Sequence, residues 1–432
     1  MNRACFIQNT TLHVHNQHAS CIRPLNNNFV RMKKRILNFI LLWALMVVGC
    51  SKEQIANTDQ SASSNVLKST AVITAGTTQQ TIRGFGGASI LTWQSDLTSA
   101  QRTTAFSTSS GMGFSILRVM VPTSSSSFAA EKPTIDVAKS YGATVIATAW
   151  NAPSSMMTNL KLNTSSYSAF AAYLKSYNTA VGGVYAISPC NEPNMNGSGW
   201  MYATATEMAN FVAQQGSNCG APIMGPEPFN MDQTYINTYL SNATANSNTK
   251  FICGHIYGKT PYSFSPGKEI WMTEYIVGSS SLSGNDWPRA MQTAQSIHDC
   301  MNVGWNAYVW WYIRRSYGPM DESGNISKVG YVMAQYARYV RPGYTKISCT
   351  ANPTSGVYVT AYKSGSKIVV VAINQNSAIT YQAFSYSGVT VTGFNRYVTT
   401  SSSNLTASSF AASGGSFGIN LAASSITTLV SY

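Results

Sequence analysis

Charged residues are scarce in this chain of 432 residues, and side chains that bind metals are scarcer. Asp, Glu, Lys and Arg make up 10% of the sequence, which contains five histidines and eight cysteines. No two cysteines form a Cys-x-x-Cys pair, which disfavours a zinc site, and the lack of a Gly-x-Gly-x-x-Gly motif disfavours a dinucleotide fold. Beyond residue 50 only His255 and His298 remain, too few for a metal cluster. The sequence therefore predicts no metal and no organic cofactor.

The cysteines do not decide whether the chain contains disulfide bonds. Five of them follow Cys50, at positions 190, 219, 253, 300 and 349. One or two disulfides could form in an oxidising compartment, but sequence spacing cannot pair them. Buried free thiols are an equal alternative.

The chain is basic, and nearly half of its net positive charge comes from the first fifty residues. The formal net charge is +13; residues 1–50 hold six Lys and Arg and no acid, so 22 basic and 15 acidic residues remain beyond them, a net charge of +7. This mild excess favours an acidic substrate. No cluster of basic and aromatic residues occurs outside Arg314-Arg315, so we expect no nucleic-acid partner.

Residues 32–50 are typical of a lipoprotein signal peptide. They begin with Met32-Lys33-Lys34-Arg35, and the apolar run Ile36–Val48 is too short to span a bilayer comfortably. The segment ends in Gly49-Cys50, which predicts a lipid on the Cys50 thiol. An ordinary signal peptide cleaved elsewhere is the alternative.

The flanking segments complete this N-terminal organisation. Residues 1–31 lack periodicity and are expected to be an upstream extension from a misassigned start codon. Residues 51–69 are rich in Ser, Asn and Gln and are expected to be a flexible tether. The only membrane contact we expect is this lipid anchor in a bacterial cell envelope, at the outer membrane because Ser51 is no retention signal; secretion is the alternative.

The rest of the chain predicts two folded parts. Within residues 70–341, short apolar segments alternate with helical periodicity, which indicates a parallel sheet; about eight units favour a closed (β/α)8 barrel. The expected strands are Ser115–Val119, Thr144–Ala149, Val184–Ser188, Pro222–Gly225, Phe251–His255, Glu269–Met272 and Ala307–Trp311. Residues 342–432 show period-two segments and predict a β-sandwich side domain, which Val72–Thr81 could join.

Two of the fifteen acidic residues stand out because each follows an apolar strand segment. They are Glu192, in Asn191-Glu192-Pro193, and Glu274, in Trp271-Met272-Thr273-Glu274. The carboxyl ends of barrel strands face the active site, and glycosidic bonds are cleaved by two carboxyl groups. Glu227 ends a third strand and is expected to support the site or its loop. The others with solvated neighbours are expected to be surface charges: Glu53, Asp59, Asp96, Glu131, Asp136, Asp286, Asp299, Asp321 and Glu322.

Aromatic and polar residues at other strand ends fit sugar binding. Trp150 and the pair Trp310-Trp311 end strand segments, and alternation along a strand sends one of that pair into the core. His255 ends another strand and is expected to line the site. Asn191 could bond a sugar hydroxyl.

Together these residues resemble glycoside hydrolase family 30, and subfamily 8 glucuronoxylanases in particular. The resemblance runs from Arg83-Gly84-Phe85-Gly86-Gly87 to the C-terminal strands, and its most specific motif is Trp-Trp-Tyr-Ile-Arg-Arg-Ser-Tyr-Gly at residues 310–318. It implies a (β/α)8 barrel with a fused β-sandwich side domain. It also implies a retaining double displacement, with Glu192 as acid/base and Glu274 as nucleophile.

The resemblance further implies roles around these glutamates. Arg118 and Tyr257 match positions that support the nucleophile. Arg315 matches the arginine that binds the carboxylate of a 4-O-methylglucuronic acid branch, and other positions around that branch are matched by Trp311, Tyr317 and Ser279. Arg314 is expected to form a structural ion pair.

Two positions depart from the pattern of the subfamily. Ile276 stands where relatives commonly have a tyrosine that touches the uronic acid, and Cys190 replaces a glutamine before Asn191. The expected function is a monomeric, branch-directed endo-β-1,4-xylanase acting on glucuronoxylan. The alternatives are a family member with relaxed specificity for plain xylan or another β-glycan, and a non-catalytic glycan-binding lipoprotein.

Overall fold

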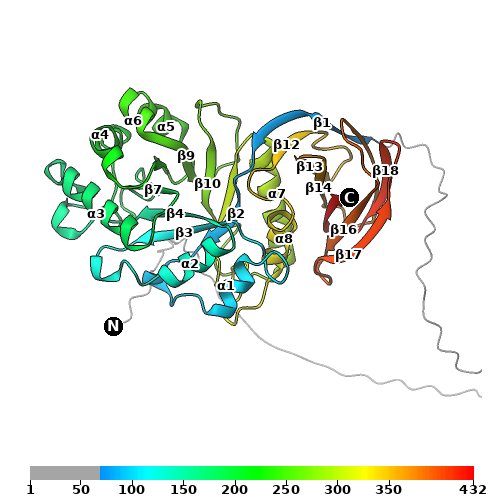
Figure 1. Ribbon diagram of the computed structural model, residues 1–432, viewed down its shortest axis with the longest axis horizontal. Coiled ribbons are helices and arrows are strands. Elements are labelled where there is room, and N and C mark those ends of the chain that lie inside the picture. The colour runs from blue at the N-terminus through cyan, green and yellow to red at the C-terminus, as the bar shows by residue number, and fades with distance from the viewer. Residues whose placement is uncertain (1–68) are drawn as a thin grey trace, which may run out of the picture. The chain divides into compact units, whose positions relative to one another are not determined.

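The computed structural model describes residues 69–432 (Figure 1). The predicted extension 1–31, the signal peptide 32–50 with its lipidated Cys50, and the tether up to residue 68 lie outside this range. Within it, no helix combines the length and the apolar character that crossing a membrane requires.

Eight parallel strands close into a barrel, which confirms the predicted fold class (Figure 1). Neighbours follow the chain around the barrel, and its last strand pairs with its first. The strands are β2 (Gly84–Ala88), β3 (Ile116–Val121), β4 (Thr144–Ala149), β7 (Ala186–Ser188), β8 (Ile223–Pro226), β9 (Thr249–His255), β10 (Ile270–Tyr275) and β11 (Ala307–Tyr312). The predicted strand Thr144–Ala149 matches the structure, and the other predicted strands overlap theirs with shifted ends.

The first barrel strand, β2, was absent from the predicted strands. Its sequence Gly-Phe-Gly-Gly-Ala has a low strand propensity because glycine has no side chain to pack. The barrel nevertheless needs glycine here, since a Cβ on Gly86 would lie 1.8 Å from the carbonyl oxygen of Ile116 on β3. The close approach of two backbones therefore overrides propensity.

Helices cover the barrel strands on the outside. They are α1 (Ser99–Phe106), α2 (Lys132–Ser140), α3 (Tyr167–Ala180), α4 (Ala205–Gln215), α5 (Gln233–Leu240), α6 (Ala243–Asn248), α7 (Trp287–Asn302) and α8 (Lys328–Ala337). Thr98 and Thr204 begin α1 and α4 with capping boxes, in which the threonine side chain and a Gln or Glu three residues on satisfy free backbone N–H groups. A short hairpin, β5 (Met157–Thr158) and β6 (Lys161–Leu162), lies between β4 and α3.

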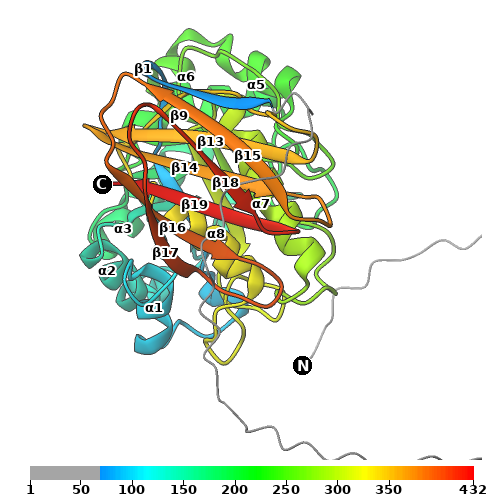
Figure 2. The same cartoon turned by 90° about the vertical axis from the view of Figure 1, so that its right-hand side faces the viewer.

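A nine-stranded sheet forms the side domain (Figure 2). Its order is β17-β16-β19-β14-β13-β12-β1-β15-β18. The bounds are β1 (Thr70–Thr81), β12 (Thr345–Cys349), β13 (Val357–Ser364), β14 (Lys367–Asn374), β15 (Thr380–Ser387), β16 (Gly393–Thr399), β17 (Thr406–Ala411), β18 (Ser416–Leu421) and β19 (Ser425–Ser431). The rings of Phe394 on β16 and Phe417 on β18 lie 4.8 Å apart although these strands are near opposite edges. The sheet therefore curls around its own core.

The side domain packs against the barrel through α7 and α8. The amide of Gln335 on α8 donates to the hydroxyl of Thr399 at 2.9 Å, and the hydroxyl of Thr428 on β19 donates to the backbone carbonyl of Gln335 at 2.8 Å. Strand β1 joins this sheet, as suggested for Val72–Thr81, before the chain enters the barrel. All five cysteines of the described region are free thiols.

Candidate active site

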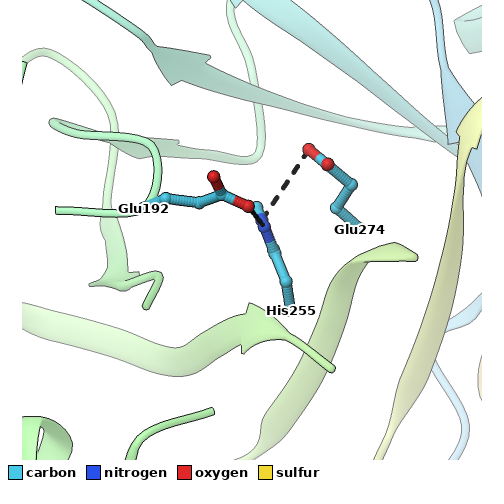
Figure 3. A group of neighbouring side chains, drawn as sticks. All are labelled: Glu192, His255 and Glu274. Atoms are coloured by element: carbon cyan, nitrogen blue, oxygen red, sulfur yellow. Dashed lines mark hydrogen bonds and ion pairs between the residues drawn. The ribbon is translucent and has the colours of Figure 1, made fainter. Parts of the chain in front are cut away.

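Glu274 lies at the carboxyl end of β10. Trp271 on the same strand points into the barrel, where its ring stacks on Phe251 at 4.1 Å. Strict alternation from Trp271 would turn Glu274 away from the interior, but the pairing with β9 shifts between Met272 and Glu274. Such an irregularity re-aims a side chain, and Glu274 faces Glu192 across the barrel mouth (Figure 3).

Glu192 follows β7 and meets Glu274 closely. One carboxylate oxygen of each residue lies within 4.8 Å of the other (Figure 3). The backbone of Glu192 is left-handed, with φ of 47°, and its N–H donates to the carbonyl of Glu227 at 3.1 Å. A non-glycine residue in this region costs about 1–3 kcal/mol and persists where the surrounding structure imposes it. The fold therefore fixes the position of the Glu192 carboxyl.

The carboxylate of Glu274 accepts two strong hydrogen bonds. Arg118 on β3 donates from Nη1 to Oε2 at 2.7 Å, and the hydroxyl of Tyr257 donates to Oε1 at 2.9 Å. Burial raises the pKa of Glu274, and the charges of His255 and Arg118 oppose that rise. Arg118 also donates to the side-chain oxygen of Asn191 at 2.6 Å, which leaves the amide N–H of Asn191 to donate elsewhere.

Glu227 is the fully buried anion below these residues. Burial opposes its charge, but Arg118, at 3.2 Å, and His255, at 3.5 Å, lower the pKa of Glu227 to about 2. The hydroxyls of Thr273 and Thr148 donate to its oxygens at 2.9 and 3.1 Å. Glu227 therefore supports the site, as expected, by balancing the charge of Arg118.

His255 links all three glutamates. Its Nδ1 lies 2.7 Å from Glu192, and its Nε2 lies 3.5 Å from Glu227 and 3.9 Å from Glu274. Burial disfavours a charged imidazole, but the surrounding carboxylates outweigh it and raise the pKa of His255 to about 9. At neutral pH the ring is therefore a cation that lines the site, as predicted.

The trio Glu192, His255 and Glu274 has atoms close enough to hold a metal ion. Two cationic groups oppose that reading: Arg118 occupies Oε2 of Glu274, and the protonated imidazole of His255 offers no lone pair. The donor set thus fits acid–base chemistry better than metal binding.

Four tryptophans form an aromatic wall beside these carboxylates: Trp93, Trp150, Trp200 and Trp311. The ring of Trp93 lies 5.4 to 6.2 Å from the other three. Trp150 is only 3% exposed, so it supports the guanidinium of Arg118, 4.6 Å from its ring, more than it offers a face to a sugar. Trp310 is fully buried while Trp311 joins the wall, as strand alternation predicted.

Trp93 and Trp200 were missed by the sequence reading. Both lie in loops that follow barrel strands, the one after β2 and the one after Glu192, and that placement was the available signal. Neither loop has a periodicity that predicts where its side chains point.

The two neighbouring arginines have different surroundings. Arg314 is buried and donates to the side chain of Gln101 at 2.8 Å and to the backbone of Ser95 at 2.7 Å, consistent with a structural role; its Nε lies 3.6 Å from Glu322. The side chain of Arg315 is 26% exposed, donates to the carbonyl of Trp93 at 2.9 Å and lies 3.8 Å from Glu322.

Two further residues, Tyr317 and Ser279, were expected to contact the uronic acid branch. Tyr317 packs against the aromatic wall, and the guanidinium of Arg289 lies 5.8 Å from its ring. Ser279 is exposed in the loop after β10, where its hydroxyl lies 2.9 Å from that of Ser281. Ile276 is half-buried in the same loop.

The comparisons with known proteins agree with this geometry. No protein-family model matches the chain. Glucuronoxylanase XynC of Bacillus subtilis strain 168 is 39% identical in an alignment of 377 residues, which covers 82% of this chain and 89% of that protein. A solved family 30 subfamily 8 xylanase, Xyn30A from Clostridium acetobutylicum, is 31% identical with a TM-score of 0.78 and covers 84% of this chain and 99% of its own. The chain belongs to glycoside hydrolase family 30, subfamily 8.

Another family 30 structure supports this assignment. A GH30 endoxylanase from Clostridium papyrosolvens C71 is 32% identical, with a TM-score of 0.79 over 84% of this chain and 100% of that one. The family resemblance inferred from the sequence motifs is thereby confirmed.

In this family 30 hydrolase, the charge on His255 predicts a loss of stability at alkaline pH. Its pKa is raised from 6.5 to about 9, so its contribution to stability is complete below 6.5 and is lost as the pH rises through 9. We expect the free energy of unfolding to fall more between about pH 6 and about pH 10 in the wild type than in His255→Gln, which does not titrate. Denaturant unfolding measures both falls; equal falls would contradict a charged His255.

Proposed function

We propose that this chain is a retaining endo-β-1,4-xylanase that hydrolyses glucuronoxylan. The proposal is carried by the closeness of the Glu192 and Glu274 carboxyl groups, which have one oxygen each within 4.8 Å of the other. Retaining glycosidases hold their two carboxyl groups about 5–5.5 Å apart, whereas inverting enzymes need about 6.5–9.5 Å to admit a water. The short distance therefore supports a covalent glycosyl intermediate. Relatives named glucuronoxylanase and xylanase support the substrate.

In the first step, Glu274 attacks the anomeric carbon while Glu192 protonates the departing oxygen. The hydrogen bonds from Arg118 and Tyr257 favour the ionised form of Glu274 against its burial and fix its direction of attack. In the second step, the ionised Glu192 takes a proton from water, the water oxygen bonds to the anomeric carbon, and Glu274 leaves. The free amide N–H of Asn191 can donate to a sugar hydroxyl during both steps.

His255 suits the change in protonation that Glu192 undergoes. When Glu192 has given up its proton, the cationic imidazole 2.7 Å away stabilises the carboxylate that must then act as a base. Because His255 is fully buried, its ring stays in place between the two steps.

Arg315 is the group that we propose binds the uronic acid branch. A guanidinium pairs with both oxygens of a carboxylate, and that of Arg315 lies 4.5 Å from the ring of Tyr312. Its contact with Glu322 is long, at 3.8 Å, and the Glu322 side chain is mostly exposed. A substrate carboxylate could therefore replace Glu322 at little cost.

Replacing Arg315 by alanine tests the branch-directed part of the proposal. Loss of a charge-assisted hydrogen bond costs about 1.5–3 kcal/mol, so we expect kcat/KM on glucuronoxylan to fall about 10- to 100-fold, with a much smaller effect on unbranched xylan. Glu322→Gln is the matched control and should keep the preference for branched substrate. Products sized by mass spectrometry measure both; equal losses on the two substrates would reject the role of Arg315.

A relaxed specificity is the second candidate, and Ile276 favours it. The side chain of Ile276 cannot donate a hydrogen bond to a uronate, so the branch contact that the family resemblance implies at this position would be missing. On this reading, wild-type enzyme would cut plain xylan as well as glucuronoxylan. A glycan-binding lipoprotein without activity would bind xylan and release no reducing ends.

The proposed location is the bacterial cell envelope, where a lipid on Cys50 would anchor a monomeric enzyme. The basic and apolar signal segment that ends in Gly49-Cys50 supports it. We expect Cys50→Ser to move the activity from the membrane fraction to the soluble fraction of the producing cell. Activity that stays with the membrane would contradict the lipid anchor.

A further inference from the structure

A pocket opens next to the aromatic wall, at the carboxyl ends of β2 and β3. Its volume is about 150 Å³. The lining includes Leu91, in the short helix Leu91–Trp93, and Met120 on β3. The segment that precedes α2 adds Ser127, Phe128, Ala130 and Glu131. Pockets that bind drug-sized ligands have volumes of about 300–1,000 Å³, so this pocket suits a smaller group, of the size of one sugar ring.

Buried polar groups gather around this pocket. The Tyr177 hydroxyl has no hydrogen-bond partner in the described part of the chain, and the carboxyl of Glu131 lies beside the hydroxyl of Ser89. Glu131 is only 5% exposed and Tyr177 only 1%. Buried polar side chains nearly always form hydrogen bonds, so the Tyr177 hydroxyl is available to bond a group that enters the pocket. The prediction that Glu131 is a surface charge was therefore wrong.

The described lining of the pocket offers no positive charge. Burial raises the pKa of Glu131 well above its usual value, and the nearby charge of Asp96 adds to the rise. Burial likewise raises the pKa of Tyr177. None of the side chains described as lining the pocket belongs to Lys, Arg or His. A carboxyl group and a phenol can both form hydrogen bonds with sugar hydroxyls, whereas an anionic sugar would find no counter-charge.

The pocket is joined to the proposed cleavage site by packed residues. Met120 lies two residues beyond Arg118 on β3, about 7 Å along the strand. It also packs with Trp150 and Tyr312 behind the aromatic wall. Because the pocket lies at the same end of the barrel as Glu274, we expect a unit beyond the one being cleaved to reach it.

We infer that this pocket binds a neutral, unbranched sugar unit of the substrate chain away from the cleaved bond. The inference rests on the proposed function and deepens it. The apolar side chains of Leu91, Met120 and Phe128 would contact the ring, while Glu131 and Tyr177 would bond its hydroxyls. The cationic Arg315 and this pocket would thus select different parts of one chain, the acidic branch and a bare backbone unit.

Filling the pocket tests the inference. Ser127→Trp places an indole at its exposed mouth, and Ser126→Trp, one residue away and outside the lining, is the matched control. We expect Ser127→Trp to lower kcat/KM about tenfold on long branched xylo-oligosaccharides and to leave the shortest cleavable one unaffected, because only long chains reach the pocket. Ser126→Trp should behave as the wild type on both.

A second variant pair separates binding from a structural role. Glu131→Leu removes the hydrogen-bonding group, and Glu131→Gln keeps it in neutral form; the glutamine variant should retain more of the long-chain advantage than the leucine variant. Equal losses on short and long substrates, or none with Ser127→Trp, would overturn the inference while leaving the proposed function intact. A wild-type enzyme that releases no products from either substrate would instead contradict the proposed function.

Discussion

Replacing Glu274 by glutamine is expected to lower kcat on glucuronoxylan by about 10⁵-fold, the scale seen when an enzyme loses its nucleophile. The amide has the shape of the carboxylate but carries no charge, so it cannot attack the anomeric carbon. Tyr257 can still donate to the amide oxygen, so the site should keep its shape. Release of reducing ends measures the loss, and thermal unfolding checks the fold.

Glu269→Gln is the matched control for this substitution. Glu269 immediately precedes the same strand, β10, at the opposite end of the barrel, where it pairs with Arg83. Its loss should leave turnover near the wild-type level. A Glu274→Gln variant that still cleaves xylan, or a Glu269→Gln variant that does not, would contradict the assignment of the nucleophile.

Replacing Glu192 by alanine should give a loss that depends on the leaving group. General acid catalysis contributes about 10²–10⁴-fold, so hydrolysis of xylan, whose sugar alcohol leaves poorly, should fall by that factor. An aryl glycoside of a branched xylo-oligosaccharide needs little protonation and should still form the glycosyl intermediate. That intermediate would then accumulate, because no base remains to activate water.

Azide should rescue the Glu192→Ala variant, because this small anion attacks without giving up a proton and can enter the space left by the carboxylate. The expected product is a glycosyl azide of retained, β configuration, identified by NMR spectroscopy. Neither the wild type nor Glu274→Gln should form it in quantity. An α-configured azide from Glu192→Ala would contradict its role as the acid/base. Rescue of Glu274→Gln in place of Glu192→Ala would indicate that the two glutamates have exchanged roles.

The barrel could be predicted from the sequence because apolar strand segments and helical periodicity alternate regularly along the chain. The closeness of Glu192 and Glu274, 82 positions apart in the chain, could also be predicted, because the carboxyl ends of barrel strands converge. The prediction from sequence failed at β2, where the close backbone of Ile116 requires glycine although glycine has a low strand propensity. It also failed at Glu131, since nothing in its polar neighbourhood predicted that this acid would be buried.

The sequence by itself determined the barrel, the side domain, the family and the two glutamates, because periodicity and short motifs are local properties of the chain. Only the tertiary structure decided how charges and rings are shared between strands: Arg118 between Glu227 and Glu274, His255 among three carboxylates, and Trp93 in the aromatic wall. Such pairings depend on distances of a few ångströms between residues far apart in the chain. Burial then sets which groups are charged, and no linear pattern records that.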